Sequence, residues 1–261
     1  MVEAVIFDWA GTTVDYGSFS PIYAFEKTFQ AYGLKPTMDE IRQPMGMLKI
    51  DHIRTMLHMQ RLESIWQAKS GRIANEADVN ELYALFQVEI FKVLGEYSVM
   101  KPYGLETIAK LRQQGIKIGS TTGYTTEMME VVTKRAQAQG YEPDCWVAPD
   151  MVNCKGRPYP YMIFRNLEHL GVSCVQNVVK IGDTVSDIVE GKNAGVKTVG
   201  IIEGSSIMGL KQADFESLTE EEKSVKCQAV QKVYEEAGAD YTIRHLGELP
   251  ALVEKIEKGH S

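Results

Sequence analysis

The sequence predicts an α/β protein in which a doubly wound parallel sheet carries an inserted, all-helical second domain. Three observations lead to this prediction. Short, continuous apolar runs recur along the chain, helix-length segments separate most of them, and far more chain than a crossover requires lies between the first run and the second. Continuous apolar character is what a parallel strand covered on both faces requires, and a crossover needs only about a dozen residues.

The strands are expected at the apolar, β-branched runs that end in polar or small residues. The expected strands are Ala4–Phe7, Ile116–Gly119, Cys145–Val147, Val178–Ile181, Thr198–Ile202 and a shorter run, Tyr241–Ile243. The core helices expected between them are Leu105–Gln114, Thr126–Gln139, Tyr161–Leu170 and Asp187–Ala194. A glycine stands where each of these helices should end, as helix C-termini favour, and the resulting β-α repetition predicts right-handed crossovers.

The insertion after the first strand reads as a helical cap of roughly 80 residues, a size that lies within the range of a small domain. The position of this insertion predicts two domains. The core domain comprises residues 1–18 and 99–261, and the cap domain comprises residues 19–98. The expected cap helices are Ile22–Tyr32, Ile50–Met59 and Glu76–Leu94, the last with apolar positions near 3.6-residue spacing. The hinges are expected near Tyr16–Ser20 and Val99–Tyr103.

Composition excludes several classes of protein. The net charge of −7 argues against a protein that binds nucleic acid through bulk positive charge. We see no secretory signal and no apolar run of the ~18–20 residues that a membrane span needs, so a cytoplasmic protein without a membrane partner is expected. The four cysteines form no CxxC pair, which indicates reduced thiols. The C-terminal residues 259–261 are expected to be frayed.

Polar residues follow several of the expected strands where each strand ends. Asp8 follows the first strand, Thr121 and Thr122 follow the second, and Asp183 and Asp187 bracket a strand-to-helix turn. Ligands of open α/β sheets bind at this edge. Carboxylates that converge there repel one another unless a cation neutralises them, and hard oxygen ligands favour Mg²⁺.

Four motifs in order resemble those of the haloacid dehalogenase superfamily. They are Phe-Asp8-Trp-Ala10-Gly-Thr12, Ser120-Thr-Thr122-Gly, Gly156-Arg157-Pro158 and Gly182-Asp183-Thr-Val-Ser-Asp187. The resemblance covers the whole core and implies an Asp8 nucleophile that forms an aspartyl-phosphate. It also implies a Ser/Thr that holds a phosphoryl oxygen, a basic residue that stabilises charge and acidic residues that bind Mg²⁺, in agreement with the chemistry of phosphoryl transfer.

Two departures from the superfamily pattern favour a particular reaction. Ala10 stands where phosphatases of the superfamily carry a second aspartate that protonates the leaving oxygen, and loss of a general acid costs about 10²–10⁴ in rate. Lys49 stands in the apolar, methionine-rich stretch from Pro44 to His52. A desolvated lysine has a lowered pKa and can form a Schiff base with a carbonyl. A C–P bond next to the resulting imine can break without an oxyanion that needs a proton.

The segments FDWAGTTVDYG, PMGMLKIDH, GSTTGYT, GRPYP and GDTVSD together resemble the phosphonoacetaldehyde hydrolase (phosphonatase) family. That resemblance implies hydrolysis of phosphonoacetaldehyde to acetaldehyde and phosphate, with catalytic Asp8 and Lys49. It implies Mg²⁺ bound by Asp8, Ala10 and Asp183, with Asp187 behind the metal ligands. The implied substrate-binding residues are Thr122, Gly123, Arg157, Met45, His52 and Tyr124. Ser18 stands where the family sometimes has cysteine, so a thiol there is not essential.

The same resemblance implies a homodimer through the cap, with the apolar face of Tyr23–Phe29 either at the dimer contact or inside the cap. Because Lys49 belongs to the cap and Asp8 to the core, closure must bring the two together.

Three alternative functions can be compared with the sequence, and one of them is excluded. A Mg²⁺-dependent phosphatase or sugar-phosphate mutase of the same superfamily predicts turnover of phosphate esters and tolerance of Lys49→Ala, and Ala10 counts against it. A catalytically idle binding protein would be expected to lack Asp8 or Asp183, and both are present. A dinucleotide-binding enzyme is excluded because no GxGxxG follows the first strand.

Overall fold

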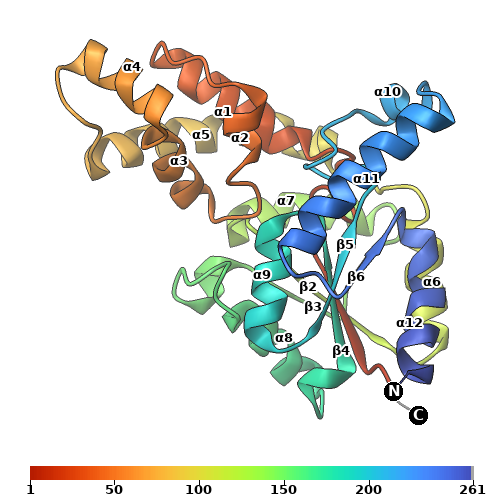
Figure 1. Ribbon diagram of the computed structural model, residues 1–261. Helices are drawn as coiled ribbons and strands as arrows, with labels where there is room; N and C mark the ends of the chain where they lie inside the picture. The colour runs from red at the N-terminus through yellow and green to blue at the C-terminus, as the bar shows by residue number, and fades with distance from the viewer. Residues whose placement is uncertain (260–261) are drawn as a thin grey trace.

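The computed structural model describes residues 1–259 and shows a six-stranded parallel sheet in the order β3-β2-β1-β4-β5-β6 (Figure 1). The predicted α/β fold is confirmed. The strands are β1 (Ala4–Phe7), β2 (Lys117–Thr121), β3 (Cys145–Val147), β4 (Val178–Gly182), β5 (Lys197–Ile201) and β6 (Tyr241–Ile243). β1 pairs in parallel with both β2 and β4, so their carboxyl ends lie next to one another.

Helices cover both faces of this sheet. In Figure 1, α6 and α12 lie on one side of the strands, and α8 and α9 lie on the other. The core helices are α6 (Gly104–Gln113), α7 (Thr126–Gln137), α8 (Tyr161–Leu170), α9 (Val185–Ala194), α10 (Gln212–Glu216), α11 (Glu220–Glu236) and α12 (Leu249–Lys258). Short 3₁₀ turns occur at Pro149–Val152, Val175–Asn177 and Leu246–Glu248.

Helix α9 begins two residues earlier than its apolar pattern indicates. Thr184 is its N-cap: its hydroxyl accepts the Asp187 backbone N–H, and the Asp187 carboxylate accepts the Thr184 backbone N–H in return. This reciprocal pairing satisfies donors that a helix start leaves free. Asp187 therefore lies in the first turn of α9, with its side chain fixed toward the edge of the sheet where β4 ends.

Five further helices lie together beyond one end of the sheet (Figure 1). They are α1 (Phe19–Ala31), α2 (Met38–Arg42), α3 (Lys49–Leu57), α4 (Gln60–Ser70) and α5 (Glu76–Tyr97). The sequence pattern missed α2 and α4, which are short or carry few buried residues. The aromatic rings of Phe25 on α1 and Phe86 on α5 have centroids 4.5 Å apart, so most of the Tyr23–Phe29 face packs inside this helical group. The domain boundaries at 19 and 98 stay a prediction.

The two segments that connect these helices to the core pair with each other. The Asp15 N–H donates to the Val99 carbonyl at 3.1 Å, and the Lys101 N–H donates to the Thr13 carbonyl at 2.8 Å. Val14 and Met100 form an antiparallel bridge between them. Both connections thus lie side by side at the base of the helical group.

The cysteines of the chain are free thiols. Within residues 1–259, no helix combines the length and apolar character that a membrane crossing demands. The cytoplasmic localisation expected from the sequence stays a prediction. The frayed tail was expected at residues 259–261, of which 260 and 261 lie outside the described part of the chain.

Candidate active site

Three carboxylates meet at the carboxyl ends of β1 and β4. Asp8 follows β1, Asp183 follows β4, and Asp187 comes from the first turn of α9. Each offers an oxygen within 4.8 Å of the others, and all three side chains are buried. The sequence placed these residues at one edge of the sheet, and the structure brings them together there.

Glycines provide the space that these carboxylates occupy. Gly11 has a φ of +87°, which favours glycine, and a Cβ on it would lie 2.1 Å from Asp183 Oδ2. A Cβ on Gly182 would lie 2.1 Å from the Asp187 carboxylate carbon. Side chains at positions 11 and 182 would therefore displace the acidic groups, so the motif glycines shape this site.

The electrostatics of the cluster fit a divalent cation. Burial, together with the charges of Asp8 and Asp187, raises the pKa of Asp183 to about 8. Three buried carboxylate oxygens at this spacing are hard ligands of the kind that Mg²⁺ and similar ions prefer. The donor set therefore agrees with the magnesium site that the sequence motifs at this edge predict. Ala10 lines the cavity next to Asp8, where its carbonyl could complete the donor set.

Arg157 lies between the carboxylates and is buried with 4% exposure. Its Nη2 donates to Asp8 Oδ1 at 2.6 Å and lies 3.0 Å from Asp187 Oδ1, while its Nε donates to Glu190 Oε2 at 3.0 Å. These partners hold the pKa of Arg157 above its ordinary value. The guanidinium is therefore a fixed, permanent cation beside the predicted nucleophile, as phosphoryl binding requires.

The turn after β2 contributes Thr122, Gly123 and Tyr124 to the same site. The Thr122 hydroxyl accepts the Tyr124 N–H at 3.0 Å. A Cβ on Gly123 would lie 2.7 Å from the Met47 carbonyl, because the loop before α3 approaches the core closely here. The predicted phosphoryl-binding turn is thus also the place where the helical group touches the core.

Lys49 is the first residue of α3 and is only 4% exposed. Its Nζ lies 5.1 Å from the ring centroid of Tyr124 and 5.9 Å from that of Phe25. Burial lowers its pKa from 10.5 to about 8, a shift that the charge of Arg157 enlarges and that of Asp8 opposes. At pH 7 such a lysine is about 10% neutral amine, against roughly 0.03% at the ordinary value.

A narrow cavity joins Lys49 to Asp8. Its lining includes eight of the predicted site residues, namely Asp8, Ala10, Met45, Lys49, Thr122, Gly123, Tyr124 and Arg157. Its volume is about 20 Å³, which is enough for about one water molecule. In this arrangement residues of the helical group and of the core meet around the cavity.

His52 lies behind Lys49 and is not among the residues that line this cavity. Its ring packs on Phe25 with centroids 3.8 Å apart, and its Nε2 donates to the Ile41 carbonyl at 2.8 Å. Burial and the nearby charge of Lys49 lower the pKa of His52 well below its ordinary value, which leaves a neutral ring. Its predicted contact with substrate stays a prediction.

Three buried charged residues near the site were missed by sequence reasoning. Lys101 donates to the Gly11 and Glu203 carbonyls, while Lys180 on β4 and Glu190 on α9 belong to the network around Arg157. The sequence does contain a signal for Lys180, which lies in the apolar run VVKIG. A charge in a buried strand is costly unless it is paired, so this lysine implies a buried acidic partner.

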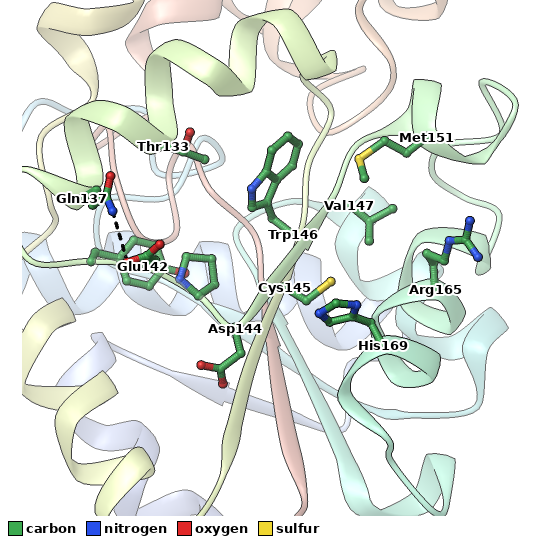
Figure 2. A pocket seen from close by; sticks show the side chains of 12 residues that line it. Thr133, Gln137, Glu142, Asp144, Cys145, Trp146, Val147, Met151, Arg165 and His169 are labelled. Atoms are coloured by element: carbon green, nitrogen blue, oxygen red, sulfur yellow. Dashed lines mark hydrogen bonds between the residues drawn. The ribbon is translucent and has the colours of Figure 1, made fainter.

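A larger hollow of about 560 Å³ lies elsewhere, beside the edge strand β3 (Figure 2). Its walls come from α7, β3 and α8, with Trp146, Met151, Arg165 and His169 among the side chains drawn. It contains none of the predicted catalytic, substrate-binding or metal-binding residues. The narrow cavity, not this hollow, is the candidate active site.

Comparison with known proteins agrees with this geometry. The family of haloacid dehalogenase-like hydrolases matches residues 2–195. A phosphonoacetaldehyde hydrolase from Bacillus cereus is 49% identical, and the match covers 98% of this chain and 97% of that protein. A bifunctional phosphonoacetaldehyde hydrolase/aminoethylphosphonate transaminase from Clostridioides difficile is 50% identical, but the chain spans only 40% of its length.

Among solved structures, a phosphonoacetaldehyde hydrolase-like protein from Oleispira antarctica has a TM-score of 0.96 and 36% identity, with 98% of this chain and 93% of that chain covered. A β-phosphoglucomutase from Clostridium difficile, at 15% identity and a TM-score of 0.69, shares the fold. By sequence and structure, the chain belongs to the phosphonoacetaldehyde hydrolase family of the haloacid dehalogenase-like hydrolases.

Proposed function

We propose that this protein hydrolyses the C–P bond of phosphonoacetaldehyde to acetaldehyde and phosphate, through a Schiff base on Lys49 and an aspartyl-phosphate on Asp8. The observation that carries the proposal is one narrow cavity lined by both a buried lysine of lowered pKa and the strand-end aspartate. The names of the curated relatives support the substrate.

Lys49 performs the first step. Its neutral amine attacks the aldehyde carbon, and the adduct takes up one proton from solvent and loses water, which leaves an imine that is protonated on nitrogen. The rings of Tyr124 and Phe25 lie near Nζ and favour a cation there. Burial thus increases the share of reactive neutral amine, and the two ring faces offset part of the cost of the charged imine.

Asp8 performs the second step. Its carboxylate oxygen attacks phosphorus, and the electron pair of the C–P bond moves into the carbon skeleton to form an enamine on Lys49. The enamine is protonated on carbon, and water releases acetaldehyde and the free amine. A second water hydrolyses the aspartyl-phosphate to phosphate, which restores Asp8. Ala10 is compatible with this sequence because the leaving carbon needs no general acid.

The phosphoryl group is bound by the turn after β2 and by Arg157. Arg157 offers Nη1, whose one contact in the described chain is a long one of 3.5 Å to the Gly46 carbonyl. The Thr122 hydroxyl and the Gly123 N–H lie at the same cavity. Donors that are fixed before substrate binds stabilise the transferred oxygens without reorganisation.

Asp8, Asp183 and the Ala10 carbonyl would hold Mg²⁺, with Asp187 fixing the positions of its neighbours. When bound, this cation supplies positive charge that stabilises the phosphoryl oxygens. We further propose the division into a core of residues 1–18 and 99–261 and a cap of residues 19–98, whose closure excludes water from the imine.

A homodimer through the cap is part of the same proposal. Phe25 and Phe29 are buried inside the helical group, so a dimer contact would use neighbours such as the half-buried Tyr23 or Val88, which is 56% exposed. A concentration-dependent mass measured by light scattering tests it, and a monomer at all concentrations would contradict it.

The test of the function is phosphate release from phosphonoacetaldehyde compared with a panel of phosphate esters. We expect release from phosphonoacetaldehyde and a loss of at least about 10³-fold for Lys49→Arg, which keeps the charge but cannot form the imine. Borohydride added with substrate should attach carbon to Lys49, as located by peptide mass spectrometry.

Lys101 is the internal control for this trapping experiment. It is equally buried with a pKa near 8, yet it donates to two carbonyls and does not line the cavity. An adduct on Lys101, or ester turnover that survives Lys49→Ala, would overturn the imine mechanism in favour of a phosphatase.

A further inference from the structure

A second layer of buried charge lies behind Arg157, on the side away from the cavity. Glu190 on α9 and Lys180 on β4 are both fully buried. Lys180 Nζ lies 2.7 Å from Asp187 Oδ1 and 3.6 Å from Glu190 Oε2. Neither residue lines the cavity, and neither has a part in the steps above.

All the contacts of Glu190 converge on one of its carboxylate oxygens. Its Oε2 accepts Arg157 Nε at 3.0 Å and the Thr121 hydroxyl at 2.9 Å, whereas Oε1 is buried with no hydrogen-bond partner in the described chain. A carboxylate buried only for stability would be expected to satisfy both oxygens. Here the hydrogen bonds are instead made by Oε2, the oxygen that accepts from the Arg157 guanidinium.

The donors of Arg157 fall into two groups. Nε and Nη2 are directed to Glu190, Asp8 and the Thr121 oxygens, while Nη1 makes only its long contact with the Gly46 carbonyl. Because the guanidinium is planar, a partner that holds Nε also fixes the direction of Nη1. Glu190 therefore fixes, together with the partners of Nη2, where the free donor points.

This constraint matters most when Asp8 reacts. Once Asp8 is bonded to phosphorus, its oxygen is no longer the anion that holds Nη2, so a guanidinium tethered by Asp8 alone would be free to turn. Glu190 lies outside the cavity, and its contact with Arg157 Nε does not involve Asp8. Lys180 binds the same Asp187 oxygen that lies 3.0 Å from Arg157 Nη2, so Asp187 divides its charge between the two cations.

We propose that Glu190, supported by Lys180, is a positioning residue that fixes the guanidinium plane of Arg157 for the phosphoryl group. The proposal rests on the function proposed above only for the identity of the substrate. Binding of inorganic phosphate, which needs no C–P cleavage, tests it independently.

The experiment compares Glu190→Gln with wild type and with Glu168→Gln, a matched change on the exposed surface of α8. Phosphate affinity is measured by calorimetry with Mg²⁺ present, kcat and KM by phosphate release, and Lys49 reactivity by borohydride trapping of acetaldehyde. We expect Glu190→Gln to weaken phosphate binding and lower kcat by about 10–100-fold, as loss of an outer partner does at other sites. Trapping should change less than about twofold, because the variant keeps the charge of Arg157 that acts on Lys49.

A double-mutant cycle separates positioning from simple support of the fold. In an Arg157→Lys background, Glu190→Gln should add little, since Glu190 acts through the guanidinium. Unchanged phosphate affinity and kcat in the single variant would overturn the proposal, as would equal losses in phosphate binding and in trapping. Full additivity in the cycle would also overturn it.

A second variant covers the case in which Glu190→Gln fails to fold. Thr121→Val removes the hydroxyl that contacts both Glu190 and Arg157 but keeps the shape of the side chain. It should weaken phosphate binding by a few fold, again with unchanged trapping. If wild type binds phosphate but does not cleave phosphonoacetaldehyde, the proposed function fails while the Glu190 comparison still stands.

Discussion

Two buried lysines of this protein differ in what surrounds their ammonium groups. Burial lowers the pKa of both Lys49 and Lys101 to about 8. Lys101 donates to the Gly11 and Glu203 carbonyls, whereas Lys49 has aromatic rings near its Nζ and, within residues 1–259, no hydrogen bond or ion pair. A lone pair on Lys49 is therefore available to a substrate, and a lowered pKa alone does not identify a nucleophile.

Imine formation on Lys49 should depend on pH with a midpoint near 8. The neutral amine is the reactive form, so the trapping rate should rise about tenfold per pH unit below this value and level off above it. The rate of covalent labelling by acetaldehyde and cyanoborohydride, followed by mass spectrometry, measures this profile. An unstructured lysine peptide serves as the control for the reagent, and a midpoint at 10 or above for Lys49 would contradict the expectation.

At the scale of elements, the turn after β1 combines backbone conformation with charge placement. Gly11 has a positive φ, and its missing Cβ leaves room for the Asp183 carboxylate. Lys101 reaches the Gly11 carbonyl from the second connection to the helical group. The turn thus links β1, the Asp183 carboxylate and the second connection to the helical group in a few residues.

Gly11→Ala should destabilise the protein more than Gly71→Ala. Both glycines have a positive φ, but a Cβ at position 71 has nothing within 4 Å, so the control carries only the backbone strain of about 1–2 kcal/mol. At position 11 the collision with Asp183 should raise the total cost to about 3 kcal/mol or more. Thermal unfolding and Mg²⁺ titration measure both changes. Equal destabilisation, with Mg²⁺ affinity unaltered, would show that the turn adapts.

Most of the elements could be predicted from the sequence because their signals are local. Continuous apolar runs located all six strands, and glycines located several helix ends. Helices α2, α4, α10, α11 and α12 were not predicted. Helices α2 and α10 have only five residues each, and α4 buries only Leu62 and Trp66, which leaves little periodicity to detect.

The site could be predicted in part for a different reason. Asp8, Lys49, Arg157 and Asp183 occur in recognisable motifs, and the structure places all four around one edge of the sheet. Glu190 could not be predicted, because a glutamate in a helix resembles a solvated residue until the fold pairs it with Arg157.

At the scale of the whole molecule, few polar contacts connect the helical group to the core away from the active site. Arg42 on α2 is the most extensive of them. Its guanidinium donates to the carbonyls of Gly17, Ser206 and Gly209 and lies over the ring of Phe19. It therefore holds α2 against the loop of residues 206–209, and in the proposed cap movement this contact would favour the closed arrangement.

Arg42→Ala should favour the open arrangement. Hydrogen exchange should increase in residues 204–209, and KM for phosphonoacetaldehyde should rise by about tenfold, as loss of a charged hydrogen-bond partner predicts. Arg61→Ala is the control, because Arg61 binds Glu40 and the Lys35 carbonyl within the helical group. Identical exchange in both variants would show that Arg42 does not hold the closed state.

Metal removal should destabilise the protein through carboxylate repulsion. With Mg²⁺ at about 100 times its Kd the folded state gains about 2.7 kcal/mol, or roughly 5–10 °C in Tm for a chain of this size. Asp183→Asn should abolish this Mg²⁺-dependent gain and leave the metal-free Tm equal or higher, because the amide is neutral at every pH, whereas the metal-free Asp183 carboxyl must take up a proton or repel its neighbours. Differential scanning calorimetry with and without chelator tests it. A metal-free variant that melts well below metal-free wild type would contradict the repulsion argument.

The pairing of the segments around Val14 and Met100 has a consequence for how this architecture can vary. The polypeptide leaves the sheet and returns to it at neighbouring points. The segment between them is therefore an insertion whose two ends are held side by side. Such an insertion can be lengthened, shortened or exchanged while its two ends keep their positions at the sheet. The residues at the strand ends can accordingly be conserved while the helical segment that carries Lys49 is replaced. A change in this segment alone can then alter which substrate is used.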